Sequence, residues 1–132
     1  MDGEKGFTLL ELMIAITILA VGMLATAAML SSGMGSDSFA YTVTVERSIA
    51  ASVIEEIMAK DGGDPMFATN VANATYVLDT VTPATTRTVQ GRTYTATYSV
   101  TTATPVIGVS RVDVTVASGL RSVTLTTFKS TV

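Results

Sequence analysis

The chain has 132 residues and a formal net charge of −3, a length that allows one small domain. Hydrophobic residues make up 48% of it and charged residues only 14%, and it contains no cysteine and no histidine. The lack of cysteine excludes disulfides, thiol nucleophiles and thiolate metal sites, and the lack of histidine removes the commonest general base and metal ligand. We therefore expect no catalytic residue, no metal site and no cofactor, and the composition argues against an enzyme.

The first expected element is an apolar helix over residues 7–36. Residues 12–30 form a run without any charge. At 1.5 Å per residue such a run covers about 28 Å, close to the thickness of the hydrocarbon core of a bilayer. A helix that is apolar all round must be enclosed, and the residues that follow are too few to wrap it while building their own core. We expect the enclosing material to be membrane lipid or other copies of the chain.

One charged residue interrupts the start of this segment. Residues 6–12 read GFTLLEL, so that Glu11 is the single charge between Phe7 and Leu30, and a short polar leader, MDGEKG, precedes it as residues 1–6. A carboxylate within an apolar helix is costly without a partner, which makes it a functional hypothesis. The leader, the GFTLLEL motif and the apolar run together resemble the signature of type IV prepilins and type II secretion pseudopilins.

The resemblance implies how this N-terminus is processed. A membrane-embedded prepilin peptidase is expected to cleave after Gly6, and the new N-terminal residue Phe7 is expected to be N-methylated. Glu11 then matches the glutamate that the family has at the fifth position of the mature chain. Cleavage creates an ammonium group, cationic at neutral pH, about one helical turn from Glu11. In a bundle of such helices, Glu11 of one subunit can form an assembly salt bridge with the Phe7 amine of a neighbour. A buried pair of this kind fixes register more than it adds stability.

Two other interpretations of the same segment were weighed. An ordinary secretory signal also has an apolar core, and Ala25-Thr26-Ala27 would serve as its cleavage site; a plain uncleaved anchor is the other alternative. The acid at the head of the run disfavours a signal, and a motif of several residues in its proper context is more specific than hydrophobicity alone. Lys5 precedes the run and no lysine or arginine follows until Arg47, which predicts a single pass through the inner membrane with a cytoplasmic N-terminus.

The helix is expected to continue, in amphipathic form, to Lys60. Gly22 and the small residues 31–36 weaken it, either as a hinge or as places where helices approach closely. Asp61-Gly62-Gly63 should then end it with a left-handed glycine cap. The predicted apolar stripe consists of Phe39, Val43, Ala50, Val53, Ile54 and Ile57. The residues predicted to lie off that stripe are Glu46, Arg47, Glu55, Glu56 and Lys60.

A connection rich in turn residues follows, over residues 64–91. It contains one short apolar piece, Thr75-Tyr76-Val77-Leu78, which we interpret as a small strand. Calcium could in principle be held by Asp61, Asp64 and Asp79. The sequence around them has no loop of alternating oxygen ligands, so we interpret them as solvated acids.

After Gly91 the hydrophobic period becomes two. The alternation predicts three strands, over residues 94–100, 112–116 and 123–125, with a looser turn at residues 104–108 and a tight hairpin at Ser118-Gly119. The apolar face of this sheet needs a partner, and the helical stripe is available. The expected fold is α+β and pilin-like: a long N-terminal helix whose hydrophobic half projects and whose amphipathic half packs on a small antiparallel sheet in a globular domain over residues 37–132.

The spacing of SIAASVIEEIMAK, residues 48–60, resembles V-type minor pilins and I-type minor pseudopilins. Many major pilins of the family carry a proline in mid-run, where this chain has Ala28, and close a C-terminal loop with a disulfide. We therefore expect a minor pilin-like subunit incorporated in or capping a type IV pilus (fimbrium). The alternatives are a minor pseudopilin of a type II secretion system, and a membrane-tethered extracytoplasmic module whose Thr-rich sheet binds a ligand.

The resemblance also implies the partners and the location. The expected partners are other pilin or pseudopilin subunits, the prepilin peptidase, the inner-membrane assembly platform, and membrane lipid before assembly. After processing, the subunit is expected in a cell-surface pilus or a periplasmic pseudopilus. The five bases of residues 65–132 are scattered and lack interleaved aromatics, so no nucleic acid is expected as a partner.

Overall fold

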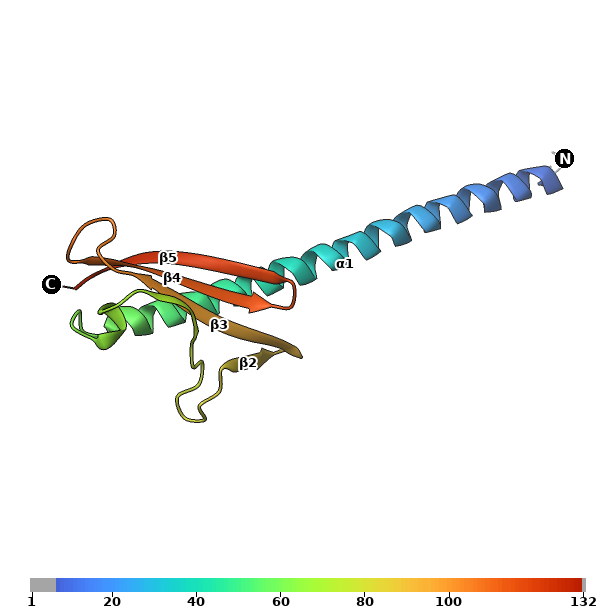
Figure 1. Ribbon diagram of the computed structural model, residues 1–132. Helices are drawn as coiled ribbons and strands as arrows, with labels where there is room; N and C mark the ends of the chain where they lie inside the picture. Colours follow the sequence, from blue (N-terminus) through green and yellow to red (C-terminus); the bar gives the residue numbers. More distant parts are fainter. Residues whose placement is uncertain (1–6, 132) are drawn as a thin grey trace. The chain divides into compact units, whose positions relative to one another are not determined.

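The computed structural model describes residues 7–131 and contains one long helix and an antiparallel sheet (Figure 1). This arrangement confirms the predicted α+β, pilin-like fold class. The chain divides into two compact units, with the division between Ala40 and Tyr41. The elements are α1 (Leu9–Ala59), the 3₁₀ helix η1 (Pro65–Phe67), β1 (Val71–Thr75), β2 (Thr86–Val89), β3 (Arg92–Thr101), β4 (Val109–Ser118) and β5 (Arg121–Ser130).

The first unit is the N-terminal part of α1. Helical geometry is unbroken through Gly22 and through residues 31–36, so the chain by itself shows no unwound turn at these small residues. All side chains from Phe7 to Tyr41 are exposed. We call residues 9–40 the rod.

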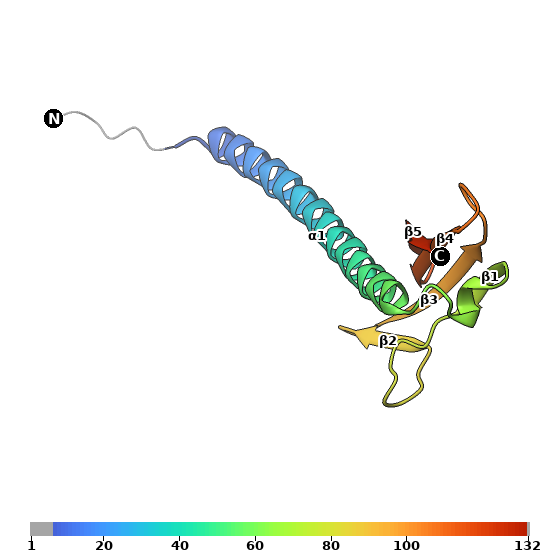
Figure 2. The same cartoon turned by 90° about the vertical axis from the view of Figure 1, so that its left-hand side faces the viewer.

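The second unit, residues 41–131, holds the sheet. Its strands are ordered β1-β3-β4-β5, and β2 also pairs with β3, so that β1 and β2 lie along the same edge of β3. All pairings are antiparallel. The ribbon in Figure 2, turned by 90°, shows the strands of this sheet from another side. β3, β4 and β5 have ten residues each and contain the three strands predicted from the alternation, which are thereby confirmed with longer bounds.

Both predicted turns of the sheet are confirmed. β4 and β5 are joined by the two residues Gly119 and Leu120, and Gly119 has φ 66°. A positive φ of this kind is natural in a tight hairpin and costs glycine little. The longer connection between β3 and β4 covers residues 102–108, where the looser turn was predicted.

The core of the second unit is formed by one face of α1 and one face of the sheet. From the helix, Ile49, Ala50, Val53 and Ile57 are buried, as the stripe predicted for three of them. The sheet contributes Tyr94, Ala96, Val100, Val112, Val114 and Val116, and Phe67 of η1 joins them. The alternation of buried and accessible residues along β4 shows which sheet face meets the helix: the even-numbered residues from Ser110 to Val116 are buried.

The predicted helical stripe was wrong at two positions, Phe39 and Glu46. Phe39 is half exposed, whereas Glu46, which we placed off the stripe, is fully buried. The stripe in the structure begins at Thr42 and continues through Glu46 to Ile49, one position in each turn. The helical period places residues 42, 46, 49, 50, 53 and 57 on one face, so the position of the sheet decides the burial of Glu46, not its polarity.

Two further predictions were wrong. The connection holds two strands, β1 and β2, where we expected one; residues 76–78 lie outside both, although the Tyr76 N–H donates to the Ala96 carbonyl at 2.8 Å. The glycine cap of α1 is also absent, because neither Gly62 nor Gly63 has a positive φ. Instead Lys129 Nζ of β5 donates to the Met58 carbonyl at 2.7 Å, which satisfies a carbonyl in the last turn of the helix.

Candidate functional site

The N-terminus of α1 is built by a side-chain cap. The Glu11 N–H donates to Thr8 Oγ1 at 3.2 Å, and the Leu12 N–H donates to the Thr8 carbonyl at 3.2 Å. Thr8 is thus the N-cap, and Glu11 stands three residues later, in the first turn. A carboxylate in this position interacts favourably with the helix dipole. The sequence analysis missed this role of Thr8, although Thr-x-x-Glu before an apolar run is a recognisable capping signal.

The predicted site residues lie together at this end of the rod, except for Gly6, which is outside the described residues. Phe7 precedes the helix and is 84% exposed, and Glu11 is exposed in the first turn. No described residue forms an ion pair with Glu11. Its carboxylate lies on the exposed surface of the first turn of α1.

The rest of the rod has the chemistry of a membrane-spanning helix. α1 contains a segment long and apolar enough to cross a bilayer. The threonine hydroxyl groups of this segment bond within the helix. Thr17 Oγ1 donates to the Met13 carbonyl at 2.7 Å, and Thr26 Oγ1 donates to the Met23 carbonyl at 2.9 Å. Internal satisfaction of this kind is what a lipid environment requires of polar groups. Glu11 is left as the one charged side chain of residues 7–36.

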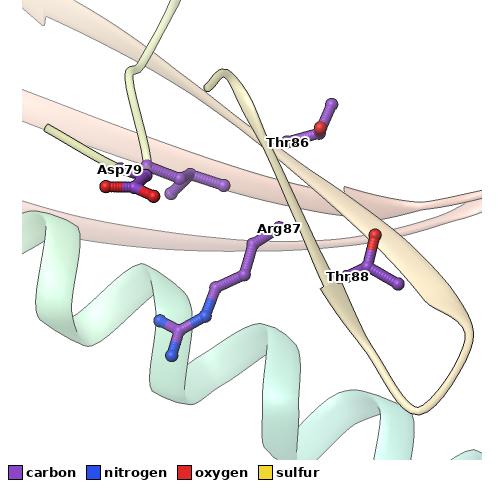
Figure 3. Close-up of a pocket in the computed structure, with 5 residues that line it drawn as sticks. Asp79, Thr86, Arg87 and Thr88 are labelled. Carbon is purple, nitrogen blue, oxygen red and sulfur yellow. The ribbon is translucent and has the colours of Figure 1, made fainter. Parts of the chain in front are cut away.

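A depression of about 430 Å³ lies on the second unit (Figure 3). It is lined by Leu78, Asp79, Thr86, Arg87 and Thr88. Asp79 accepts hydrogen bonds from the Val81 N–H and from the Thr82 N–H and hydroxyl, and these bonds, with that to the Thr82 hydroxyl the most important, lower the pKa of its carboxyl group. The Asp79 carboxylate thus stabilises its own turn.

The other loop acids are committed in the same way. Asp61 Oδ1 accepts from the Gly63 N–H at 3.1 Å, and Asp64 Oδ1 accepts from the Met66 N–H at 2.9 Å at the start of η1. Among residues 7–131, no group of three or more acidic side chains is arranged to hold a metal ion. The aspartates considered as calcium ligands instead stabilise three separate turns.

A tyrosine pair borders the helix in the second unit. The Tyr76 hydroxyl donates to Glu56 Oε2 at 2.8 Å, and the rings of Tyr76 and Tyr98 meet edge to face with centroids 6.0 Å apart. Burial, reinforced by the hydrogen bond to Glu56 and by its charge, raises the pKa of Tyr76 well above its ordinary value. This contact ties the segment after β1 to α1, and its role is structural.

Comparison with known proteins agrees with the N-terminal geometry. A family model described as the prokaryotic N-terminal methylation motif matches residues 1–27. No curated protein and no solved structure matches the chain. The match covers the leader, Phe7, Glu11 and most of the apolar run, and it indicates a type IV pilin-like or pseudopilin precursor. The motif also suggests assembly with other pilin subunits and processing by a prepilin peptidase.

Proposed function

We propose that the protein is a minor pilin-like subunit, processed after Gly6 and incorporated in or capping a type IV pilus. The observation that carries the proposal is the carboxylate of Glu11, which has no ion-pair partner among the described residues and is the one charged side chain in the exposed residues 7–36. The match of residues 1–27 to the N-terminal methylation motif supports it, because the proposed cleavage site at Gly6-Phe7 lies within those residues.

The chemistry of assembly follows from the two charges at the end of the rod. Before assembly the rod is held in membrane lipid, and both the Phe7 amine and Glu11 can reach the interface. When the rod leaves the lipid for a bundle of similar rods, each charge loses its water and needs an opposite charge. The Phe7 amine of a neighbouring subunit supplies that charge to Glu11, and the pair selects the register of the subunits.

The processing step is tested by intact mass. Protein extracted from membranes should have the mass of a chain that begins at Phe7, increased by one N-methyl group. An N-terminus at Met1, as in an uncleaved anchor, or after Ala27, as in an ordinary secretory signal, would contradict the proposal. Co-expression with a prepilin peptidase and without one shows whether the cleavage depends on that enzyme.

The assembly step is tested by Glu11→Ala, with Thr8→Ala as the matched control. Glu11→Ala should leave cleavage and membrane insertion intact but reduce incorporation into sheared filaments, because it removes the partner of the neighbour's amine. Thr8→Ala weakens the cap of the same helical turn, at a cost of about 1 kcal/mol, and keeps the charge. Equal incorporation of the Glu11→Ala variant and the unmodified chain would rule out this role for Glu11.

The accessory position is tested by stoichiometry. Quantitative mass spectrometry of purified filaments should find this chain far below the main subunit, and finding it as the dominant protein would overturn the assignment as a minor subunit. The same measurement, made on pili and on a secretion pseudopilus in separate deletion strains, distinguishes the pilus from the type II secretion alternative.

A further inference from the structure

The sheet of the second unit has one face that α1 does not cover. Val112 and Val114 of β4 are buried against the helix. Arg111 and Asp113 alternate with them along the strand, so their side chains lie on the opposite face of the sheet. Cross-strand pairing places Thr126 of β5 beside Asp113 and Phe128 beside Arg111. We call these four residues, Arg111, Asp113, Thr126 and Phe128, the outer patch.

The carboxylate of the outer patch is held in one orientation. Asp113 Oδ1 accepts hydrogen bonds from Arg111 Nε at 3.0 Å, from Arg111 Nη2 at 2.9 Å and from Thr126 Oγ1 at 2.6 Å. Three donors on a single oxygen leave Asp113 Oδ2 without a hydrogen bond to any described residue. The Asp113 side chain remains 18% exposed, so the second oxygen is an oriented acceptor beside solvent.

An aromatic ring lies next to this acceptor. Phe128 is 52% exposed on the outer face of the sheet, and Val109 of β4, which pairs with Ser130, is a partly exposed apolar residue of the same face. The neighbouring positions of the face carry hydroxyl groups, as in the cross-strand pair Thr115 and Thr124, whose oxygens are 2.8 Å apart. The ring of Phe128 therefore stays half exposed in a surface that carries mostly hydroxyl groups.

The outer patch therefore combines an apolar ring face, an oriented carboxylate oxygen and a half-exposed guanidinium. A ligand that complements it needs a flat apolar surface for Phe128 and hydroxyl groups that donate to Asp113 and accept from Arg111. The charges of Arg111 and Asp113 cancel, so the patch does not select a charged ligand. A protein partner would need a larger desolvated apolar centre than one ring provides. We propose that the outer patch binds a neutral, hydroxyl-rich glycan, with a sugar ring stacked on Phe128.

The test is equilibrium binding of the full chain, kept in a detergent without a sugar headgroup, to soluble maltohexaose, cellohexaose and a mannose oligomer. We expect at least one of these neutral oligomers to bind. Because truncation of an aromatic anchor typically costs more than 1 kcal/mol, Phe128→Ala should weaken binding about tenfold. Asp113→Asn should weaken binding as well, because the amide replaces one acceptor oxygen of the carboxylate by an NH2 group.

Leu120→Ala is the matched control. Like Phe128, Leu120 is a large apolar residue of the β4–β5 hairpin. It is fully exposed and lies in the turn, away from the outer patch. Its removal should leave binding unchanged. The proposal is overturned if none of the neutral oligomers binds, if dextran sulfate alone binds, or if Phe128→Ala and Leu120→Ala weaken binding equally. Binding by the outer patch does not depend on cleavage or assembly, so its failure leaves the proposed subunit role standing.

Discussion

Glu46 is the residue whose replacement tests the packing of the helix on the sheet most directly. It is fully buried on the face of α1 that meets the sheet, between Thr42 and Ala50 along the helical stripe. Neither of its carboxylate oxygens has a hydrogen-bond partner among the described residues, and the buried hydroxyl of Tyr94 has none either. A buried polar group without a partner costs free energy that folding must offset elsewhere.

The expected magnitude follows from the burial and the missing partners. Leaving a buried polar group unsatisfied costs about 1–3 kcal/mol, and more if the group is charged. An apolar side chain of similar volume at this position has no polar atom to leave unsatisfied, so it removes a cost of this size. Methionine is similar to glutamate in length and in helix propensity, so Glu46→Met removes the cost without a large cavity. Glu46→Gln should stabilise less, because an amide keeps polar atoms in the same apolar surroundings.

The assay is thermal and urea unfolding of a chain that begins at Asp37, which we expect to be soluble, monomeric and cooperative because the core residues all lie in the second unit. Since about 1 kcal/mol moves the midpoint of a domain of this size by roughly 4–8 °C, Glu46→Met should raise Tm by at least about 4 °C. Glu55→Met, at an exposed position of the same helix, is the control and should change stability by less than about 0.5 kcal/mol. A Glu46→Met variant that loses stability while Glu55→Met does not would show that Glu46 has a stabilising partner, and would refute this reasoning.

Two further predictions concern contacts that hold the second unit together. A Cβ added at Gly62 would lie 2.8 Å from the Ser130 carbonyl oxygen, whereas at Gly63 the nearest atom is 3.9 Å away. In urea unfolding, Gly62→Ala should therefore lower the free energy of unfolding by about 1–3 kcal/mol, and Gly63→Ala should not. The pKa of Tyr76 is raised in the fold by burial and by Glu56, so its contribution to stability is complete below its unfolded pKa of about 10 and is lost as the pH rises further. Tyr76→Phe should flatten the decline of Tm between about pH 9 and 11, and an unchanged pH profile would assign the decline to other groups.

The parts of the fold that local sequence determines were the parts predicted well. The rod, the motif around Glu11 and the alternating strands β3 to β5 each carry their signal in neighbouring residues, as hydrophobic runs or periods. Glu46 was misplaced because helical period alone does not specify which stripe the sheet will cover. β1 and β2 were misplaced because they are short and polar, and they become strands through pairing with β3, a contact distant in sequence.

The composition of the rod gives the proposed role of Glu11 in assembly a physical basis. Its apolar side chains are mostly alanine, leucine, isoleucine and methionine, spread around the whole helix, so sliding one rod along another by a turn exchanges similar contacts for similar contacts. Its threonines give no preference either, because Thr17 and Thr26 bond to carbonyls of their own helix. Glu11 differs from all of these residues, because a register that leaves it without a cation costs about 3–5 kcal/mol for an uncompensated buried charge. In the proposed assembly, the charge pair would therefore select the register, and the apolar surface would supply the attraction.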